Sequence, residues 1–183
     1  MTAPSGIYVL ALIGGPAAAR IAETTARFDP KLARRHPAHL TLAGSSGMGP
    51  LRADYTAERL RALIEPIASR TAPIPLQFGT VERFSGTNVV VLPLSPHGAL
   101  RHLHDAIKRS GVEFERPRFA FTPHVTLSFF PTLAPDALRE LLAVRISEPA
   151  WVDRLLLSRT REPQSPEDLL ELTLGTRNQG IRE

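Results

Sequence analysis

A four-residue pattern that could carry acid–base chemistry occurs twice in the sequence. The copies are His39-Leu40-Thr41-Leu42 and, 85 residues further on, His124-Val125-Thr126-Leu127. Both lie in runs that favour a β-strand, at 38–43 and 119–130. Because side chains alternate along a strand, each histidine shares one face with its threonine, while the aliphatic residues point to the other face, into a core.

Two imidazoles and two hydroxyls that meet in one cleft suit phosphodiester chemistry. One histidine can take a proton from an attacking water or hydroxyl, and the other can protonate the departing oxygen. Histidine titrates near neutrality, so one neutral and one protonated copy can coexist. The threonine hydroxyls can donate to non-bridging phosphate oxygens. Such a site needs neither a metal nor a cofactor. The alternative is that both motifs are ordinary His–Thr pairs on a polar sheet face.

On these residues the sequence resembles the two-histidine phosphoesterase superfamily, which includes the bacterial 2′-5′ RNA ligase-like proteins. The family hallmark is a pair of His-x-Thr/Ser-x motifs with hydrophobic x, and Pro123 before the second histidine also matches. The resemblance covers the chain from its first strand to about residue 176. It implies a bilobal fold and a site in which His39 and His124 are the general acid/base pair. Thr41 and Thr126 would then be the phosphate-binding hydroxyls.

The resemblance also implies an enzyme that opens 2′,3′-cyclic phosphate ends of RNA or nucleotides, or that acts on 2′-5′ linkages, without a metal. Two alternatives stay open. One is a non-catalytic module that binds RNA or a nucleotide in the same cleft. The other is a phosphodiesterase for a small cyclic phosphate such as an ADP-ribose derivative.

The remaining patterns predict how these motifs are positioned. Strands are expected at 7–15, 38–43, 74–84, 88–94, 119–130, 151–160 and 169–176. Helices are expected at 17–35, broken at Asp29-Pro30, from Thr56 onward, at 98–110 and at 134–146. Each half thus repeats a helix, a strand, a helix and two strands. We expect one domain over residues 1–183, built of two pseudo-repeated lobes. Its fold class is α+β, with two antiparallel sheets flanked by helices around a central cleft.

Composition excludes several kinds of site. The 183 residues contain no cysteine, which rules out disulfides, zinc–thiolate or iron–sulfur centres and a thiol nucleophile. Of the 22 basic residues 20 are arginine, at a net charge of +4, which fits either a phosphate-bearing partner or the codon bias of a GC-rich genome. The apolar run at 7–15 has no basic residue before it and is too short to span a bilayer. We therefore expect a cytoplasmic monomer without a membrane partner.

Three further residues are weaker candidates for substrate contact. Ser128 continues the alternation of His124 and Thr126, although a plain polar strand residue would look the same. Arg83, with Phe84 beside it, could hold a phosphate and stack a base, or could simply end a strand. Tyr8 could stack on a base, or belong to the core.

The other histidines do not form a convincing metal site. On a helix, His102 and His104 point to nearly opposite sides, and no carboxylate completes a set with His97. A surface helix is the better interpretation, and His36 beside two arginines is interpreted as part of a solvated turn. The glycine-rich segment 44–50 fits neither of the common phosphate-loop patterns, so it is expected to be a mobile lip of the cleft.

Overall fold

The apolar run near the start of the chain forms an inner strand of a five-stranded antiparallel sheet. The computed structural model describes residues 6–129, 133–160 and 166–175. In it β1 (Gly6–Gly14) pairs with β2 (His39–Ala43) on one side and with β7 (Trp151–Thr160) on the other. Both β3 (Ile74–Pro75) and β8 (Glu167–Thr173) pair with β7. The sheet thus has β2 as an edge strand.

A second, three-stranded antiparallel sheet has the order β4-β5-β6. Its strands are β4 (Glu82–Arg83), β5 (Val90–Pro93) and β6 (His124–Ser128). The prediction of one strand over 74–84 was wrong, because β3 belongs to the large sheet and β4 to the small one. Prolines at 73 and 75 and a glycine at 79 interrupt the extended pairing, as these residues do in strands.

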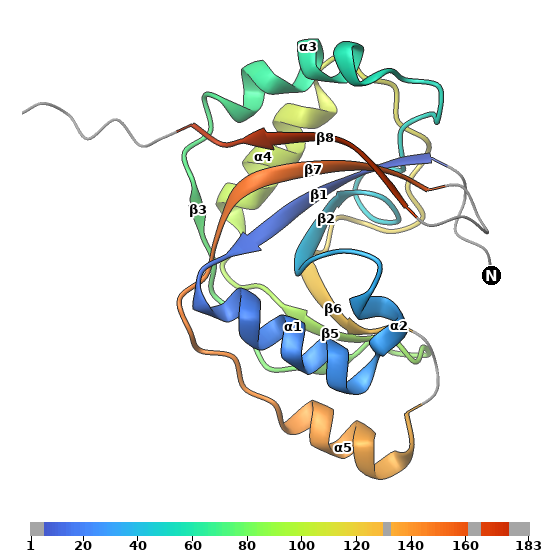
Figure 1. Ribbon diagram of the computed structural model, residues 1–183, viewed down its shortest axis with the longest axis vertical. Helices are drawn as coiled ribbons and strands as arrows, with labels where there is room; N and C mark the ends of the chain where they lie inside the picture. The colour runs from blue at the N-terminus through green and yellow to red at the C-terminus, as the bar shows by residue number, and fades with distance from the viewer. Residues whose placement is uncertain (1–5, 130–132, 161–165, 176–183) are drawn as a thin grey trace, which may run out of the picture.

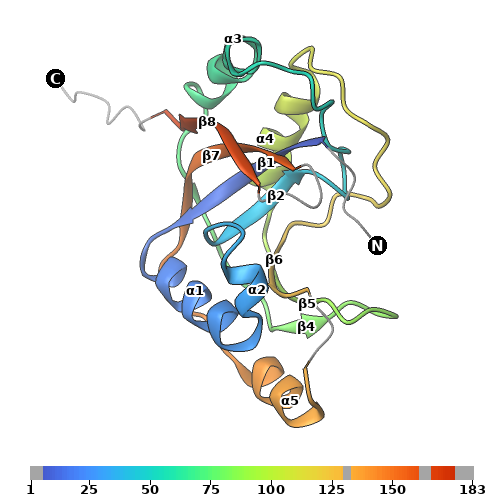
Figure 2. The ribbon, with the colours of Figure 1, turned by 45° about the vertical axis from the view of Figure 1, so that its right-hand side comes forward.

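In the part of the chain that the structure describes, five helices lie between the strands: α1 (Pro16–Phe28), α2 (Pro30–Ala33), α3 (Ala57–Ala68), α4 (Gly98–Lys108) and α5 (Pro135–Ala143). The predicted break at Asp29-Pro30 is confirmed, since Asp29 separates α1 from α2. The predicted start of α3 is also confirmed, because the Thr56 hydroxyl accepts a hydrogen bond from the Arg59 amide at 3.2 Å. Figures 1 and 2 show α3 and α4 beside the large sheet, and α1, α2 and α5 around the small one.

The two faces of the large sheet bury different sets of side chains. Ile7, Val9 and Ala11 of β1 belong to the main hydrophobic core. The opposite face carries a small separate cluster of Leu10, Leu12 and Leu156, with Tyr8 packed against it. His39 pairs with Leu12 and Thr41 with Leu10, so the first motif lies on the face with the small cluster, away from the main core.

The predicted α+β class, with two antiparallel sheets and flanking helices, is confirmed. Strands of the second half complete the large sheet, because β7 and β8 join β1 and β2. The strand expected over 119–130 starts only at His124, and its expected end at Phe130 lies outside the described residues, as does the end of the last strand at Thr176. No helix among the described residues is long and apolar enough to cross a membrane.

Candidate active site

The two motif strands contact each other although they belong to different sheets. β2 is an edge strand of the large sheet and β6 of the small one, and they lie against each other without pairing. Along both strands the His and Thr residues are half-buried while the aliphatic residues after them are buried, as the alternation predicted. His39 of β2 and Thr126 of β6 line one cavity. The fold therefore brings the two motifs together.

Each imidazole is held in the same way by the main chain two residues before it. The Nδ1–H of His39 donates to the Pro37 carbonyl oxygen at 2.7 Å. The Nδ1–H of His124 donates to the Thr122 carbonyl oxygen, also at 2.7 Å. A carbonyl can only accept, so Nδ1 carries the proton in both rings. In the neutral form the free Nε2 of each ring is then the atom that can take up a proton.

The electrostatic setting favours neutral imidazoles in the free protein. Burial lowers the pKa of His39 from its usual 6.5 to about 4, opposed by the Pro37 hydrogen bond and assisted by the nearby His36 and His124. Burial also lowers the pKa of His124, again against the effect of its main-chain hydrogen bond. The sequence allowed one neutral and one protonated copy to coexist, whereas both pKa shifts favour the neutral form in the free protein. An anion bound between the rings would have to raise one pKa.

A third histidine joins the first motif. The rings of His36 and His39 lie edge to face with centroids 5.5 Å apart, and both line a cavity of about 270 Å³ beside α1 and α2. Burial lowers the pKa of His36, partly offset by Asp168. His36 does follow a turn, as interpreted, but it is half-buried rather than solvated. The only hint in the sequence that His36 lies near His39 was that it precedes it by three residues. Across a turn whose shape is unknown, that spacing does not predict whether the two rings meet.

An aromatic side chain contacts the second histidine. Phe84 and His124 lie edge to face with ring centroids 4.8 Å apart. Phe84 follows β4 and begins the turn that leads to β5, since the Phe84 amide donates to the Val89 carbonyl. Its neighbour Arg83, named from the sequence as a candidate for substrate contact, is exposed on β4. The β4–β5 connection therefore reaches the second motif through Phe84.

The other sequence candidates lie in different surroundings. Tyr8 is half-buried on the same sheet face as Thr41, packed on the small apolar cluster. Ser128 is fully buried, and its hydroxyl has no hydrogen-bond partner among the described residues. A register shift in the β5–β6 pairing at Val90 lies beside Ser128.

The α4 histidines differ from one another. His102 is exposed and His97, just before α4, is half-buried. His104 is only 3% exposed and stacks on Phe121 with ring centroids 4.0 Å apart. The surface-helix interpretation was thus wrong for His104. Among the described residues no group of three or more histidine and carboxylate side chains could hold a metal ion.

Comparison with known proteins identifies the family. A sequence profile of the 2′-5′ RNA ligase superfamily matches residues 14–164, and the chain belongs to this superfamily. This confirms the resemblance to the two-histidine phosphoesterases that the motifs indicated.

Two curated relatives match in part. A protein of Geobacillus thermodenitrificans (strain NG80-2), named "Putative phosphoesterase", is 37% identical over 62 residues, 33% of this chain and 35% of that protein. A protein of the same description from Geobacillus kaustophilus (strain HTA426) is 31% identical over 93 residues, 50% of each chain. The match thus spans between a third and half of these relatives.

Solved structures match over nearly the whole length. The crystal structure of Escherichia coli LigT complexed with 3′-AMP superposes with a TM-score of 0.55 and 20% identity, over 94% of this chain and 99% of that one. The complex of LigT with phosphate gives a TM-score of 0.54 at 19% identity, over 96% and 100%. At these identities the likeness establishes the fold.

Proposed function

We propose that this protein is a phosphoesterase that hydrolyses 2′,3′-cyclic phosphate ends of RNA or nucleotides, with His39 and His124 as the acid–base pair. The observation that carries the proposal is the matched setting of the two rings. Each lies on an edge strand, each donates its Nδ1–H to a main-chain carbonyl, and each shares its face with a threonine. Membership of the 2′-5′ RNA ligase superfamily supports the substrate class.

Burial lowers the pKa of both rings, and the stronger lowering at His39 supports the following division of roles. The pKa of His39, at about 4, keeps its Nε2 free of a proton at neutral pH, so this ring is the general base. An anionic phosphate bound beside His124 raises the pKa of that ring, which lets it hold a proton on Nε2 and act as the general acid. His39 takes a proton from the attacking water as the water oxygen bonds to phosphorus. His124 protonates the ribose oxygen whose bond to phosphorus breaks.

The threonines complete the site. The hydroxyls of Thr41 and Thr126 donate hydrogen bonds to the non-bridging oxygens, where negative charge increases in the transition state. The product is a phosphomonoester, with one oxygen from water. The two imidazoles supply both proton transfers, so the proposed reaction requires no metal ion. LigT of E. coli was crystallised with 3′-AMP, a ribose phosphomonoester of the kind this reaction would release.

The first test is turnover of 2′,3′-cyclic AMP in excess EDTA, with ³¹P NMR to detect the products and H₂¹⁸O as solvent. We expect a phosphomonoester that carries one solvent oxygen, formed at the same rate with and without EDTA. Loss of activity in EDTA with recovery on adding a divalent cation would overturn the metal-free mechanism.

A substrate panel distinguishes the alternatives. It comprises 2′,3′-cyclic AMP, a short RNA with a 2′,3′-cyclic end, a 2′-5′ linked dinucleotide and an ADP-ribose cyclic phosphate. We expect the two 2′,3′-cyclic substrates to be hydrolysed fastest. Binding of all four without turnover would contradict the enzyme and support a nucleotide-binding module. Preference for the ADP-ribose compound would contradict RNA as the substrate class.

A further inference from the structure

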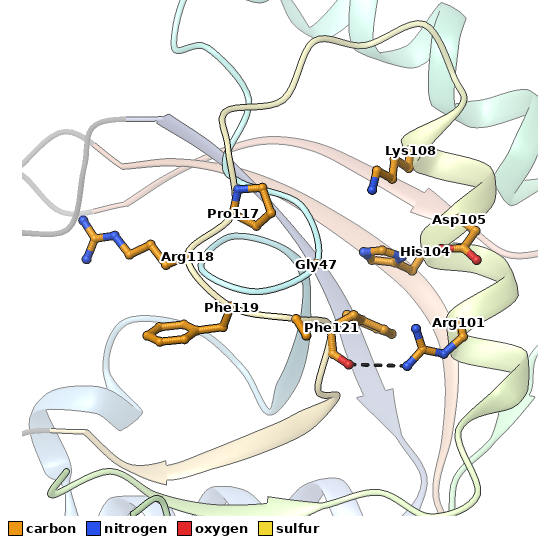
Figure 3. Close-up of a pocket in the computed structure, with 10 residues that line it drawn as sticks. Gly47, Arg101, His104, Asp105, Lys108, Pro117, Arg118, Phe119 and Phe121 are labelled. Atoms are coloured by element: carbon orange, nitrogen blue, oxygen red, sulfur yellow. Dashed lines mark hydrogen bonds and ion pairs between the residues drawn. The ribbon is translucent and has the colours of Figure 1, made fainter. Parts of the chain in front are cut away.

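A second cavity lies outside the two-histidine site, between α4 and the loops that flank the motif strands. It has a volume of about 440 Å³. One wall is α4, and the others are segment 117–121, which leads into β6, and the loop after β2 at Gly47. The two loops are joined, because the Gly47 amide donates to the Phe119 carbonyl at 2.9 Å and the Arg118 amide to the Ser45 carbonyl at 3.0 Å. Figure 3 shows this arrangement.

The cavity is lined by cations that have no carboxylate partner. Arg101, Lys108 and Arg118 line it, and among the described residues none of the three forms an ion pair. By contrast, most of the arginines that do form ion pairs in this fold pair with a carboxylate on a neighbouring turn or strand. The one carboxylate of the lining, Asp105, accepts the Nδ1–H of His104 at 2.8 Å. With three cations and one carboxylate, the lining carries a net positive charge.

A buried polar atom lies in the same wall. His104 is 3% exposed, and its Nε2 has no hydrogen-bond partner among the described residues. In Figure 3 the imidazole points from α4 across the cavity wall toward Gly47, between Arg101 and Lys108. This nitrogen is packed against Gly47, because a Cβ added at Gly47 would overlap it, so His104 belongs to the packed wall of the cavity.

Aromatic groups accompany the cations. The ring of Phe121 stacks on the imidazole of His104. The guanidinium of Arg101 also lies over the Phe121 ring, 5.5 Å from the centroid of that ring. Phe119 is 67% exposed on the segment that forms one wall of the cavity, a large fraction for a phenylalanine. Arginine and lysine side chains beside an exposed aromatic ring are the elements with which proteins bind the phosphate and base of single-stranded nucleic acid.

We propose that this α4 cavity is a second binding site, for a phosphate-bearing ligand of the nucleotide class, with Arg101 and Lys108 as its phosphate ligands. The two residues are seven positions apart on one helix, so their Cα atoms are separated by about 10 Å and their side chains can converge on one phosphate. The choice of nucleotides as the ligand class rests on the proposed function. The evidence that the cavity binds a phosphate comes from its cationic lining and is independent of that function.

Two sources could supply this phosphate. One is an internal phosphate of the RNA strand whose end is in the two-histidine site. Phe121, whose carbonyl accepts a hydrogen bond from Arg101 at 3.4 Å, precedes His124 by three residues, so their Cα atoms are at most about 11 Å apart. A short RNA could span that interval. The other source is a free mononucleotide or inorganic phosphate bound independently.

The test compares the double variant Arg101→Gln/Lys108→Gln with Arg59→Gln/Arg70→Gln. The control removes the same charge at exposed positions on and after α3 that do not line the cavity. Binding of inorganic phosphate, 3′-AMP and a six-nucleotide RNA with a 3′-phosphate is measured by calorimetry at several salt concentrations. We expect the cavity variant to weaken RNA binding about tenfold and to reduce the salt slope by about 1.4, the value for two lost contacts to a single strand. The control should change the affinity less than twofold.

The three probes distinguish an internal RNA phosphate from a free phosphate ligand. Weaker binding of RNA alone assigns the cavity to an internal phosphate of the strand, and weaker binding of 3′-AMP or phosphate as well assigns it to a free ligand. Equal affinities of the cavity variant, the control and the unmodified protein for all three probes would overturn the proposal.

Hydrolysis of 2′,3′-cyclic AMP is measured in parallel and tests only the two-histidine site. Failure of that reaction with intact binding at the cavity would refute the proposed function alone. Retained hydrolysis with unchanged RNA binding would refute the cavity site alone.

Discussion

Asp29 is predicted to be the carboxylate on which the position of the second motif most depends. It is 3% exposed. Its Oδ1 accepts the Leu32 amide at 2.9 Å, which caps α2, and its Oδ2 accepts the Phe129 amide at 2.8 Å, directly after β6. One side chain therefore ties the α1–α2 junction to the strand that carries His124.

The cost of removing this carboxylate follows from its two hydrogen bonds. Loss of the helix cap costs about 1 kcal/mol. Loss of the acceptor for the Phe129 amide costs about 1–3 kcal/mol if that amide stays without a partner. Asp29→Ala should therefore lower the free energy of unfolding by about 2–4 kcal/mol. Asp29→Asn, which keeps one acceptor oxygen, should cost about half as much.

Equilibrium unfolding in urea measures both changes. Asp136→Ala is the matched control, because that carboxylate also lies at a helix start but its side chain is 82% exposed. Its ion pair with Arg139 should contribute at most about 1 kcal/mol. A loss for Asp29→Ala below about 1 kcal/mol, or no larger than that of the control, would refute the assignment.

Three further predictions concern the surroundings of the two motifs. Since the native pKa of His39 is about 4 and its usual value 6.5, the unfolded chain takes up the proton first. The contribution of His39 to the free energy of unfolding is therefore fully present above pH 6.5 and is lost as the pH drops toward 4. Between pH 7 and 5 the free energy of unfolding should fall by about 2 kcal/mol. Urea unfolding of His39→Gln should lack that loss, and an equal loss would contradict the assignment. Phe84→Ala should expose the His124 ring and raise its pKa toward 6.5 in an NMR titration, and a fall would contradict the burial argument. Gly47→Ala should lower the melting temperature more than Gly86→Ala. Both glycines have φ +71°, but only at Gly47 would a Cβ overlap packed side chains. Equal changes in melting temperature would contradict the packing around Gly47.

The local pattern of the motifs could be predicted from sequence, because a strand has a side-chain period of two that needs no tertiary information. The half-buried His and Thr and the buried aliphatic residues of β2 and β6 agree with it. The same holds for the Thr56 cap and the break at Asp29-Pro30, which depend on neighbouring residues only.

The contact between the motifs could not be predicted in the same way. It depends on β2 and β6 being edge strands of different sheets, which is decided by pairings between residues far apart in sequence, such as β1 with β7. The burial of His104 and the place of His36 beside His39 have the same origin. Neither residue differs locally from a surface histidine, and only the packing of other segments against it makes the difference.

The kinetics of single and double variants show whether His39 and His124 act as a pair. The turnover number for 2′,3′-cyclic AMP is measured for His39→Ala, His124→Ala and the double variant. We expect each single variant to lose a factor of about 10²–10⁴, the range for one general acid or base. The double variant should lose far less than the product of the two, because the groups act as a unit. Full turnover in either single variant would show that this histidine is not part of an acid–base pair.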